Sequence, residues 1–169
     1  MNILEQIAAQ TRERIEAEKR QTPTEELIRQ IKATEQKKSK QSFYEALKKP
    51  GMSYICEVKK ASPSKGLIAS DFPYLDIARE YEAAGASAIS CLTEPFRFLG
   101  KDAYLQEIAA QVEIPVLRKD FTVDEYMIYQ ARLLGASAVL LICAILDDAQ
   151  LRAYRELAES LGMDALVEA

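Results

Sequence analysis

The sequence contains no histidine among its 169 residues. This absence excludes Ser-His-Asp and Cys-His catalysis and metal sites with histidine ligands for this chain. Lysine, glutamate, aspartate or tyrosine must therefore carry any acid–base chemistry that it performs.

Cysteine is scarce, and long apolar runs are absent. The three cysteines, Cys56, Cys91 and Cys143, are scattered through apolar stretches. This number and spacing predict reduced core residues, not a disulfide framework or a metal site. No apolar run approaches the roughly 20 residues of a membrane helix, and the charged, helix-periodic N-terminus does not resemble a signal peptide. We therefore expect a cytoplasmic protein without a membrane partner.

The composition is that of an ordinary globular protein, with 49% hydrophobic residues and a formal net charge of −4. Such mild acidity argues against a nucleic-acid partner, because nucleic-acid-binding domains are usually basic. The length is sufficient for one domain with a sizeable core.

The first fifty residues are polar and follow a helical pattern. Residues 1–20 carry a loose apolar stripe, and residues 42–51 are predicted to form a short third helix that is ended by Pro50 and Gly51. The stretch 22–36 contains a helix start at Thr24, with two glutamates in its first turn. We interpret residues 1–50 as an N-terminal helical extension.

From residue 53 onward, short β-rich runs alternate with helical stretches. This alternation predicts βαβ units and a parallel sheet. The predicted strands are "YICEVK", "ASAISCL", "PVLRK", "ASAVLLI" and "DALVEA". Residues 51–169 are therefore expected to contain about five parallel strands with helices between them.

An internal repeat supports this interpretation. The segments "GASAIS", "GASAVL" and "GMDALV" begin at Gly85, Gly135 and Gly162. Each indicates a helix that ends with glycine at its C′ position, followed by a strand. The repeat favours either a (β/α) barrel or a doubly wound sheet. An eight-stranded barrel needs about 250 residues, so this chain would hold slightly more than half of one.

Charged residues interrupt the first predicted strand. Glu57 and Lys59 are two residues apart, so they share one face, while Cys56 and Val58 take the other. In a (β/α) barrel, the apolar face packs against helices and the charged face points into the barrel, near the end where such enzymes hold their active sites. The alternatives are a buried ion pair that only fixes the core and a strand end exposed to solvent.

Two further strands end in a charged residue. Lys119 directly precedes Asp120, and Glu168 ends the last predicted strand. Together with Glu57 and Lys59, these residues come from the first, third and fifth strands, and alternate strands fill a common layer in a barrel. Two lysines and two glutamates at one mouth would form a suitable acid–base set. The alternative is that each charge is a solvated strand terminus.

The segment "KKASPSKG" after the first strand is locally basic in an acidic protein. Its cations, Lys60 and Lys65, and its hydroxyls, Ser62 and Ser64, suit an anionic substrate. A solubilising turn would have the same composition. The segment "EPFRFLGK" and Phe121 bring aromatic side chains to the same end, where they either wall an aromatic substrate or cap the core.

The segment "YICEVKKASPSKGLI" resembles the signature of indole-3-glycerol phosphate synthases, the ring-closing barrel enzymes of tryptophan biosynthesis. The resemblance covers essentially the whole chain, and it implies the α/β class, a TIM (β/α)8-barrel family with an N-terminal helical extension. The other matching segments are "SFYEALKKPG", "AREYEAAGASAISCLTEPFRFLG", "IPVLRKDF", "GASAVLLI" and "GMDALVEA".

The resemblance also implies a reaction. The substrate would be 1-(2-carboxyphenylamino)-1-deoxyribulose 5-phosphate, a phosphorylated anthranilate-sugar. The products would be indole-3-glycerol phosphate, carbon dioxide and water. No metal and no organic cofactor would take part.

By the family pattern, Lys119 matches the general acid that protonates the substrate carbonyl during ring closure. Glu168 matches the glutamate that assists it, and Glu57 and Lys59 match the pair associated with the substrate carboxylate and the later dehydration. The positions that match the substrate-binding residues are Ser62, Pro63, Phe98 and Phe121.

The departure from the family is length, because strands six to eight and the phosphate loops of a barrel would follow residue 169. We therefore expect residues 51–169 to form a partial barrel, an N-terminal fragment that is inactive alone and is complemented by the missing half. The alternative from another class is a non-catalytic half-barrel scaffold that associates with itself through open sheet edges. A related phosphosugar isomerase barrel is a third alternative, against which "EVKKASPSKG" argues.

Overall fold

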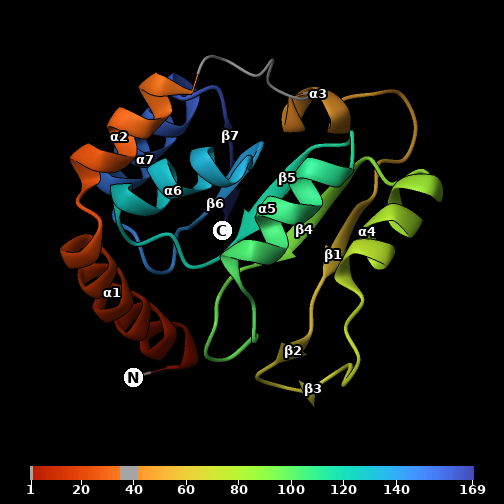
Figure 1. The fold of residues 1–169 in the computed structure, drawn as a ribbon, viewed down its shortest axis with the longest axis horizontal. Helices are drawn as coiled ribbons and strands as arrows, with labels where there is room; N and C mark the ends of the chain where they lie inside the picture. The colour runs from red at the N-terminus through yellow and green to blue at the C-terminus, as the bar shows by residue number, and fades with distance from the viewer. Residues whose placement is uncertain (1, 35–41) are drawn as a thin grey trace.

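A five-stranded parallel sheet organises the chain (Figure 1). The computed structural model describes residues 2–34 and 42–169. The strands follow one another across the sheet in chain order, β1-β4-β5-β6-β7, and every pairing is parallel. Their bounds are Ile55–Val58 for β1, Ala88–Leu92 for β4, Val116–Lys119 for β5, Ala138–Ile142 for β6 and Asp164–Glu168 for β7. All five predicted strands are therefore present, and the sheet is parallel as expected.

Four helices connect successive strands and cover one face of the sheet. They are α4 (Tyr74–Ala83), α5 (Asp102–Gln111), α6 (Glu125–Leu134) and α7 (Asp148–Ser160). Their apolar side chains pack with those of the strands in the main core, which contains Leu105, Ile108 and Ile128 from the helices. We call this covered side the helix face and the opposite side the inner face.

Side chains alternate between these two faces along each strand. Val58, Ile89 and Cys91 belong to the core on the helix face, whereas Ala88 and Leu117 belong to a second cluster on the inner face. Val58 is buried as predicted, but Cys56 is only half-buried. The three cysteines are free. The prediction that all of them are core residues is wrong for Cys143, which is exposed because it lies beyond the end of β6.

The glycine repeat ends three of the connecting helices. At the end of α4, the Ala86 N–H donates to the Tyr81 carbonyl and the Gly85 N–H donates to the Glu82 carbonyl, both at 3.0 Å. This hydrogen-bond pattern needs a left-handed residue, and Gly85 has a φ of 91°. The same arrangement ends α6 and α7, so the repeat marks the points where the chain turns back into the sheet.

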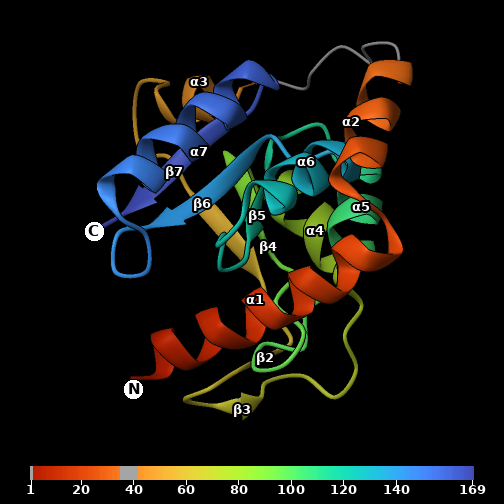
Figure 2. The same cartoon turned by 90° about the vertical axis from the view of Figure 1, so that its left-hand side faces the viewer.

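The N-terminal helices are α1 (Ile3–Gln21), α2 (Thr24–Ala33) and α3 (Phe43–Leu47). Ile7 of α1 and Phe43 of α3 pack into the inner-face cluster, and α2 packs against α6. Figure 2 shows α1 at the same end of the molecule as the β2–β3 segment, and α3 at the opposite end. Residues 35 and 36 of the predicted second helix lie outside the described residues. The division of the chain at residue 50 stays a prediction.

The segment "KKASPSKG", expected to be a loop, forms most of a short antiparallel hairpin that ends at Leu67. Its strands are β2 (Ala61–Ser62) and β3 (Gly66–Leu67), and Ser62 pairs with Gly66. Gly66 has a φ of 64°, a left-handed conformation that favours glycine. The prediction missed the hairpin because each of its strands is only two residues long.

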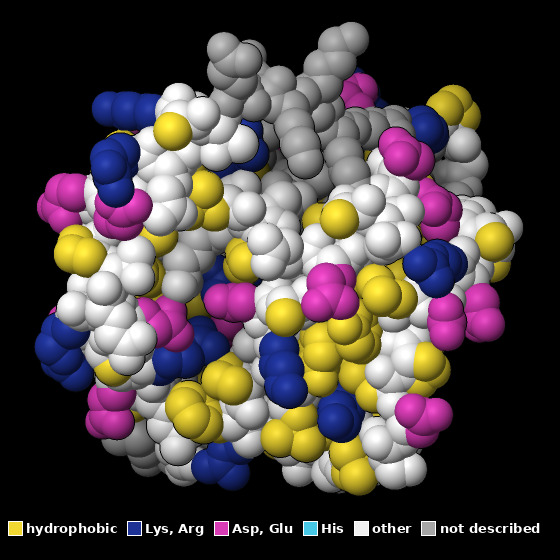
Figure 3. Space-filling model, viewed as in Figure 1, with side chains coloured by type: hydrophobic (Ala, Val, Ile, Leu, Met, Phe, Trp, Pro, Cys, Tyr) yellow, Lys and Arg dark blue, Asp and Glu magenta, His cyan; other side chains and the backbone are white. Residues whose placement is uncertain are grey.

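Charges of both signs are interspersed over the face seen in Figure 3, and hydrophobic side chains gather below its centre. In the part of the chain that the structure describes, no helix has the length and apolar character needed to cross a bilayer.

Candidate functional site

Four charged side chains meet at the edge of the sheet where the parallel strands end. Lys59 Nζ lies 2.8 Å from Glu57 Oε1, and Lys119 Nζ lies 3.9 Å from Glu57 Oε2. Lys119 Nζ also lies 4.0 Å from Glu168 Oε2. The structure therefore brings together the two lysines and two glutamates that the sequence placed at strand ends. We call these four residues the Lys-Glu cluster.

Side chains alternate between the two faces of the sheet along each strand, and this alternation explains why the four charged side chains lie together. Glu57 lies one residue before Val58, which packs on the helix face, so the Glu57 side chain takes the inner face. In the parallel register, Lys119 pairs with Leu92 and Glu168 pairs with Ile142, so all of these residues lie at the carboxyl ends of their strands. The fold thus brings residues that are far apart in the sequence together in one cluster.

Ser90, which the sequence analysis did not identify, contacts the cluster. Ser90 pairs with Glu57 in the sheet, is 3% exposed, and donates a hydrogen bond from its Oγ to Glu57 Oε2 at 3.3 Å. A polar residue in the otherwise apolar strand "AISCL" was the signal that could have identified it. Ser90 restrains the carboxylate that faces both lysines.

The exposure of the cluster bears on what it does. The side chains of Glu57, Lys59 and Lys119 are about one-third exposed, and that of Glu168 is half exposed. Ion pairs at such hydrated positions contribute little to stability. The cluster instead presents ammonium donors beside carboxylate acceptors, which is the arrangement that general acid–base catalysis requires.

Two aromatic side chains lie on the same face of the sheet as the Lys-Glu cluster. The ring centroids of Phe98 and Phe121 are 6.3 Å apart, with their planes inclined by 39°. Phe121 is buried in the inner-face cluster, and Phe98 packs against it while remaining half-buried. The two rings therefore help to close the inner-face core, and Phe98 keeps part of its surface free for another contact.

The remaining predicted positions lie on the β2–β3 hairpin that follows β1. Ser62 is buried, and its Oγ accepts a hydrogen bond from the Lys65 N–H at 3.2 Å. The Ser64 Oγ lies 3.5 Å from the Ser62 Oγ. Pro63 is exposed at the tip. The Ser62 hydroxyl is thus engaged within the turn, whereas Pro63 is accessible.

A buried polar network adjoins the cluster, and the sequence reasoning did not foresee it. The side chain of Asp120, next to Lys119, is fully buried. Its two carboxylate oxygens accept hydrogen bonds from Arg14 at 3.1 and 3.2 Å. They also accept the Thr93 hydroxyl at 2.7 Å and the Phe121 N–H at 2.8 Å. Burial lowers the pKa of Arg14, but the Asp120 carboxylate more than offsets this and raises it. The network fixes the end of β5 where Lys119 emerges.

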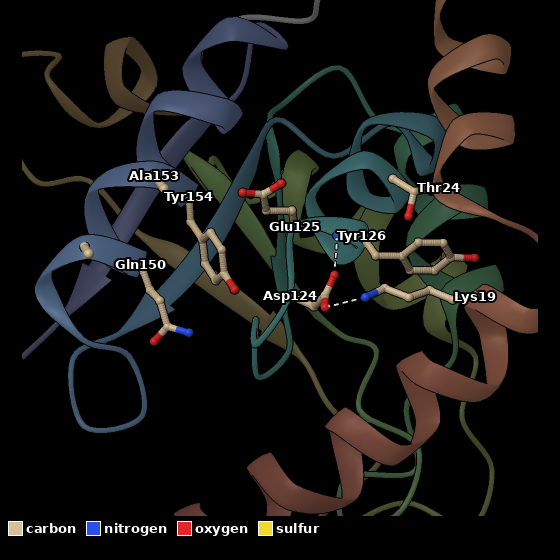
Figure 4. A pocket seen from close by; sticks show the side chains of 9 residues that line it. Lys19, Thr24, Asp124, Glu125, Tyr126, Gln150, Ala153 and Tyr154 are labelled. Atoms are coloured by element: carbon tan, nitrogen blue, oxygen red, sulfur yellow. Dashed lines mark hydrogen bonds and ion pairs between the residues drawn. The ribbon is translucent and has the colours of Figure 1, made fainter.

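A hollow of about 550 Å³ lies elsewhere, where α1 and α2 approach the first turns of α6 and α7 (Figure 4). Four of its polar side chains are already paired. Lys19 Nζ contacts Asp124 at 2.5 Å, the Tyr126 hydroxyl donates to the Thr22 carbonyl, and the Tyr154 hydroxyl donates to the Val123 carbonyl. None of the four residues of the Lys-Glu cluster lines this hollow.

Comparison with known proteins agrees with the geometry. A family model described as "Indole-3-glycerol phosphate synthase" matches residues 4–169. A relative from Ruminiclostridium cellulolyticum is 52% identical over 167 residues, which are 99% of this chain and 64% of the relative. Relatives from Endomicrobium trichonymphae and Lacticaseibacillus paracasei are each 54% identical with the same coverage. All three carry the name "Indole-3-glycerol phosphate synthase".

The chain spans about 64% of the length of these curated relatives. Its five parallel strands, with the four connecting helices on one face, agree with part of a TIM barrel, the fold of the family. The family model matches nearly the whole chain, and about half of the matched residues are identical to those of these relatives. The chain therefore belongs to the indole-3-glycerol phosphate synthase family.

Proposed function

We propose that this chain, as part of a complete barrel, catalyses the ring closure of 1-(2-carboxyphenylamino)-1-deoxyribulose 5-phosphate to indole-3-glycerol phosphate. The observation that carries the proposal is the position of Lys119, whose Nζ lies within 4.0 Å of carboxylates on both Glu57 and Glu168. An ammonium group held between two carboxylates is oriented for proton donation.

In the proposed reaction, the Lys119 ammonium protonates the substrate carbonyl oxygen as the ring carbon that bears the carboxylate attacks the carbonyl carbon. The new carbon–carbon bond closes the five-membered ring, and the carboxylate leaves as carbon dioxide. The hydroxyl formed from the carbonyl then leaves as water, and loss of a proton restores the aromatic system. Glu168 stabilises the positive charge that develops during closure.

Glu57 and Lys59 take the remaining steps in this proposal. Their 2.8 Å ion pair places a cation for the substrate carboxylate beside a carboxylate base for the dehydration. The division of these two roles follows from charge, because a cation attracts the anionic group and a carboxylate accepts a proton. Phe98, Phe121 and Pro63 would contact the anthranilate ring, and Ser62 belongs to the same substrate loop. The reaction requires no resident metal or cofactor, and we place it in the cytoplasm.

The proposal is tested with a ring-closure assay run on this chain alone and on a complete barrel. The complete barrel joins the chain to the remaining part of the Ruminiclostridium cellulolyticum relative, which is 52% identical over the matched residues. We expect negligible turnover by the chain alone and measurable turnover by the complete barrel. A complete barrel that folds but does not form indole-3-glycerol phosphate would contradict the proposed activity.

A second candidate function is that of a non-catalytic half-barrel that assembles with itself. It is favoured by the sheet order, in which β1 and β7 lie at the two edges of the described sheet. Sheet edges present unpaired backbone groups that recruit other strands. Analytical ultracentrifugation of the chain alone tests this candidate, because a monomer at all concentrations would contradict self-assembly.

A further inference from the structure

One buried carboxylate organises the loop that carries Phe98. This loop, residues 94–100, connects β4 to α5, and Glu94 at its start is 0% exposed. Glu94 Oε1 accepts the N–H of Phe96 at 2.9 Å, and Oε2 accepts the N–H groups of Arg97 at 2.7 Å and Phe98 at 2.9 Å. Three consecutive backbone amides thus converge on a single side chain.

The other end of the loop, at Gly100, is also held by close backbone contacts. The Gly100 N–H donates to the Glu94 carbonyl at 2.8 Å, which closes the loop on itself. A Cβ at Gly100 would lie 2.4 Å from the Leu92 carbonyl oxygen, so no side chain fits between the loop and β4. Leu99 takes a left-handed conformation with a φ of 53°. These constraints leave the backbone of the loop little freedom.

The loop places one aromatic ring at the inner face. Phe98 packs against the inner-face cluster beside Phe121, whereas Phe96 of the same loop is 53% exposed. The N–H of Phe98 is itself bound by Glu94 Oε2, so the carboxylate determines where the Phe98 Cα lies. Moving the carboxylate would move the ring.

A buried charge is an unfavourable way to order a loop, because desolvating a carboxylate is costly unless hydrogen bonds compensate it. The three amide donors to Glu94 provide that compensation, and hydrogen bonds to a charged acceptor are stronger than those between neutral groups. Such an arrangement is understandable where a ring must be held in one place. We infer that Glu94 is a positioning residue, which acts through Phe98 to orient the aromatic ring of the substrate; this inference rests on the proposed function.

The loop itself can be tested without any assay of activity. The chain contains no tryptophan, so Phe98→Trp introduces a sole tryptophan into the loop. In this background, we expect Glu94→Ala to free the loop and to about double the acrylamide quenching of the tryptophan emission, since a locally opened segment is more accessible. Unchanged quenching and anisotropy would overturn the inference.

The functional consequence is tested in the complete barrel. We expect Glu94→Ala to raise KM about tenfold, the factor that corresponds to 1.4 kcal/mol of lost binding. The kcat should change far less, because Glu94 does not touch the reacting atoms. Glu94→Gln keeps one acceptor oxygen in place and should raise KM less than Glu94→Ala, and it serves as the test should the alanine variant fail to fold.

A double substitution separates positioning from general stability. In a Phe98→Ala background, Glu94→Gln should produce no further rise in KM, because it acts only through the missing ring. The matched control is Glu82→Gln. The Glu82 carboxylate also accepts backbone N–H groups, from Glu113 at 2.6 Å and Ile114 at 3.1 Å, but near the amino end of β5. We expect the KM of this control to stay unchanged.

An equal rise in KM with and without Phe98 would show that Glu94 does not act through the ring. The two proposals fail in different ways. If the unsubstituted complete barrel shows no ring closure, the proposed function is wrong. If the barrel is active but Glu94→Gln leaves KM unchanged, only the positioning role is wrong.

Discussion

Glu57 lies on the inner face of β1, between two lysines and opposite Ser90. A charged residue in an apolar strand is unfavourable when it is isolated, but here the carboxylate is one-third exposed and has a cation on each oxygen. The same reasoning applies to Lys119, which lies between Glu57 and Glu168. At the residue scale, each member of the cluster is therefore tolerated because of the others.

The cysteines provide a residue-scale prediction. Burial, with a contribution from the Asp102 carboxylate, raises the pKa of the Cys91 thiol to about 12. Only about 1 part in 10,000 of this thiol would be ionised at pH 8, and the thiolate is the reactive species. Cys143 is exposed. We expect a maleimide reagent to modify Cys143 rapidly and to leave Cys91 unmodified in the native chain, as measured by mass spectrometry.

Unfolding the chain in urea supplies the control for this prediction, because all three cysteines should then react. Modification of native Cys91 as fast as Cys143 would contradict the burial of β4 against the helices.

At the scale of elements, the features that could be predicted from the sequence are those that depend on the local pattern of residues. The five strands and the helices between them follow from hydrophobic periodicity and from glycines that end helices, so they were found near their expected positions. The β2–β3 hairpin was missed because two-residue strands leave no periodic pattern. Within the site, Lys119 and Glu168 could be predicted from their places at strand ends. Glu94 and Asp120 could not, since their importance depends on burial and on partners that only the folded chain supplies.

The ion pair between Arg14 of α1 and Asp120, which follows β5, leads to a prediction at the scale of elements. Arg14 binds the fully buried Asp120 at 3.1 Å, so Arg14→Met removes the nearer of the two cations that face this carboxylate. The second cation, Arg118, remains, with its Nη2 3.9 Å from Asp120 Oδ2. Leaving a buried charge without its partner costs about 3–5 kcal/mol. Because Arg118 still faces the carboxylate, we expect a loss at the lower end of this range, about 3 kcal/mol, in the free energy of unfolding. Urea denaturation followed by circular dichroism measures it.

The matched control for this prediction is Arg29→Met. Arg29 pairs with Glu26 on the surface of α2, and its side chain is 77% exposed. Exposed pairs of this kind contribute less than about 1 kcal/mol. Equal losses for the two variants would show that the Arg14–Asp120 contact does not hold α1 to the sheet.

At the scale of the whole molecule, the sheet divides structural and chemical tasks between its faces. The helix face is closed by the apolar core of α4 to α7, and the inner face carries the Lys-Glu cluster and the two phenylalanines. The cluster residues come from β1, β5 and β7 or directly follow β1, and these are alternate strands of the sheet. Side chains from alternate strands share a layer in a barrel, which agrees with the family fold. Only the assembled sheet can place them together.

The central claim is that Lys119 is the general acid of ring closure. The most direct test is the turnover of Lys119→Met in the complete barrel, compared with Lys48→Met. Lys48 lies over the ring of Tyr44 at the end of α3, at the opposite end of the molecule, and is the matched control. We predict that Lys119→Met lowers kcat by about 100- to 10,000-fold, the usual contribution of a general acid, with an unchanged circular dichroism spectrum. Near-normal turnover by a folded Lys119→Met variant would contradict this assignment.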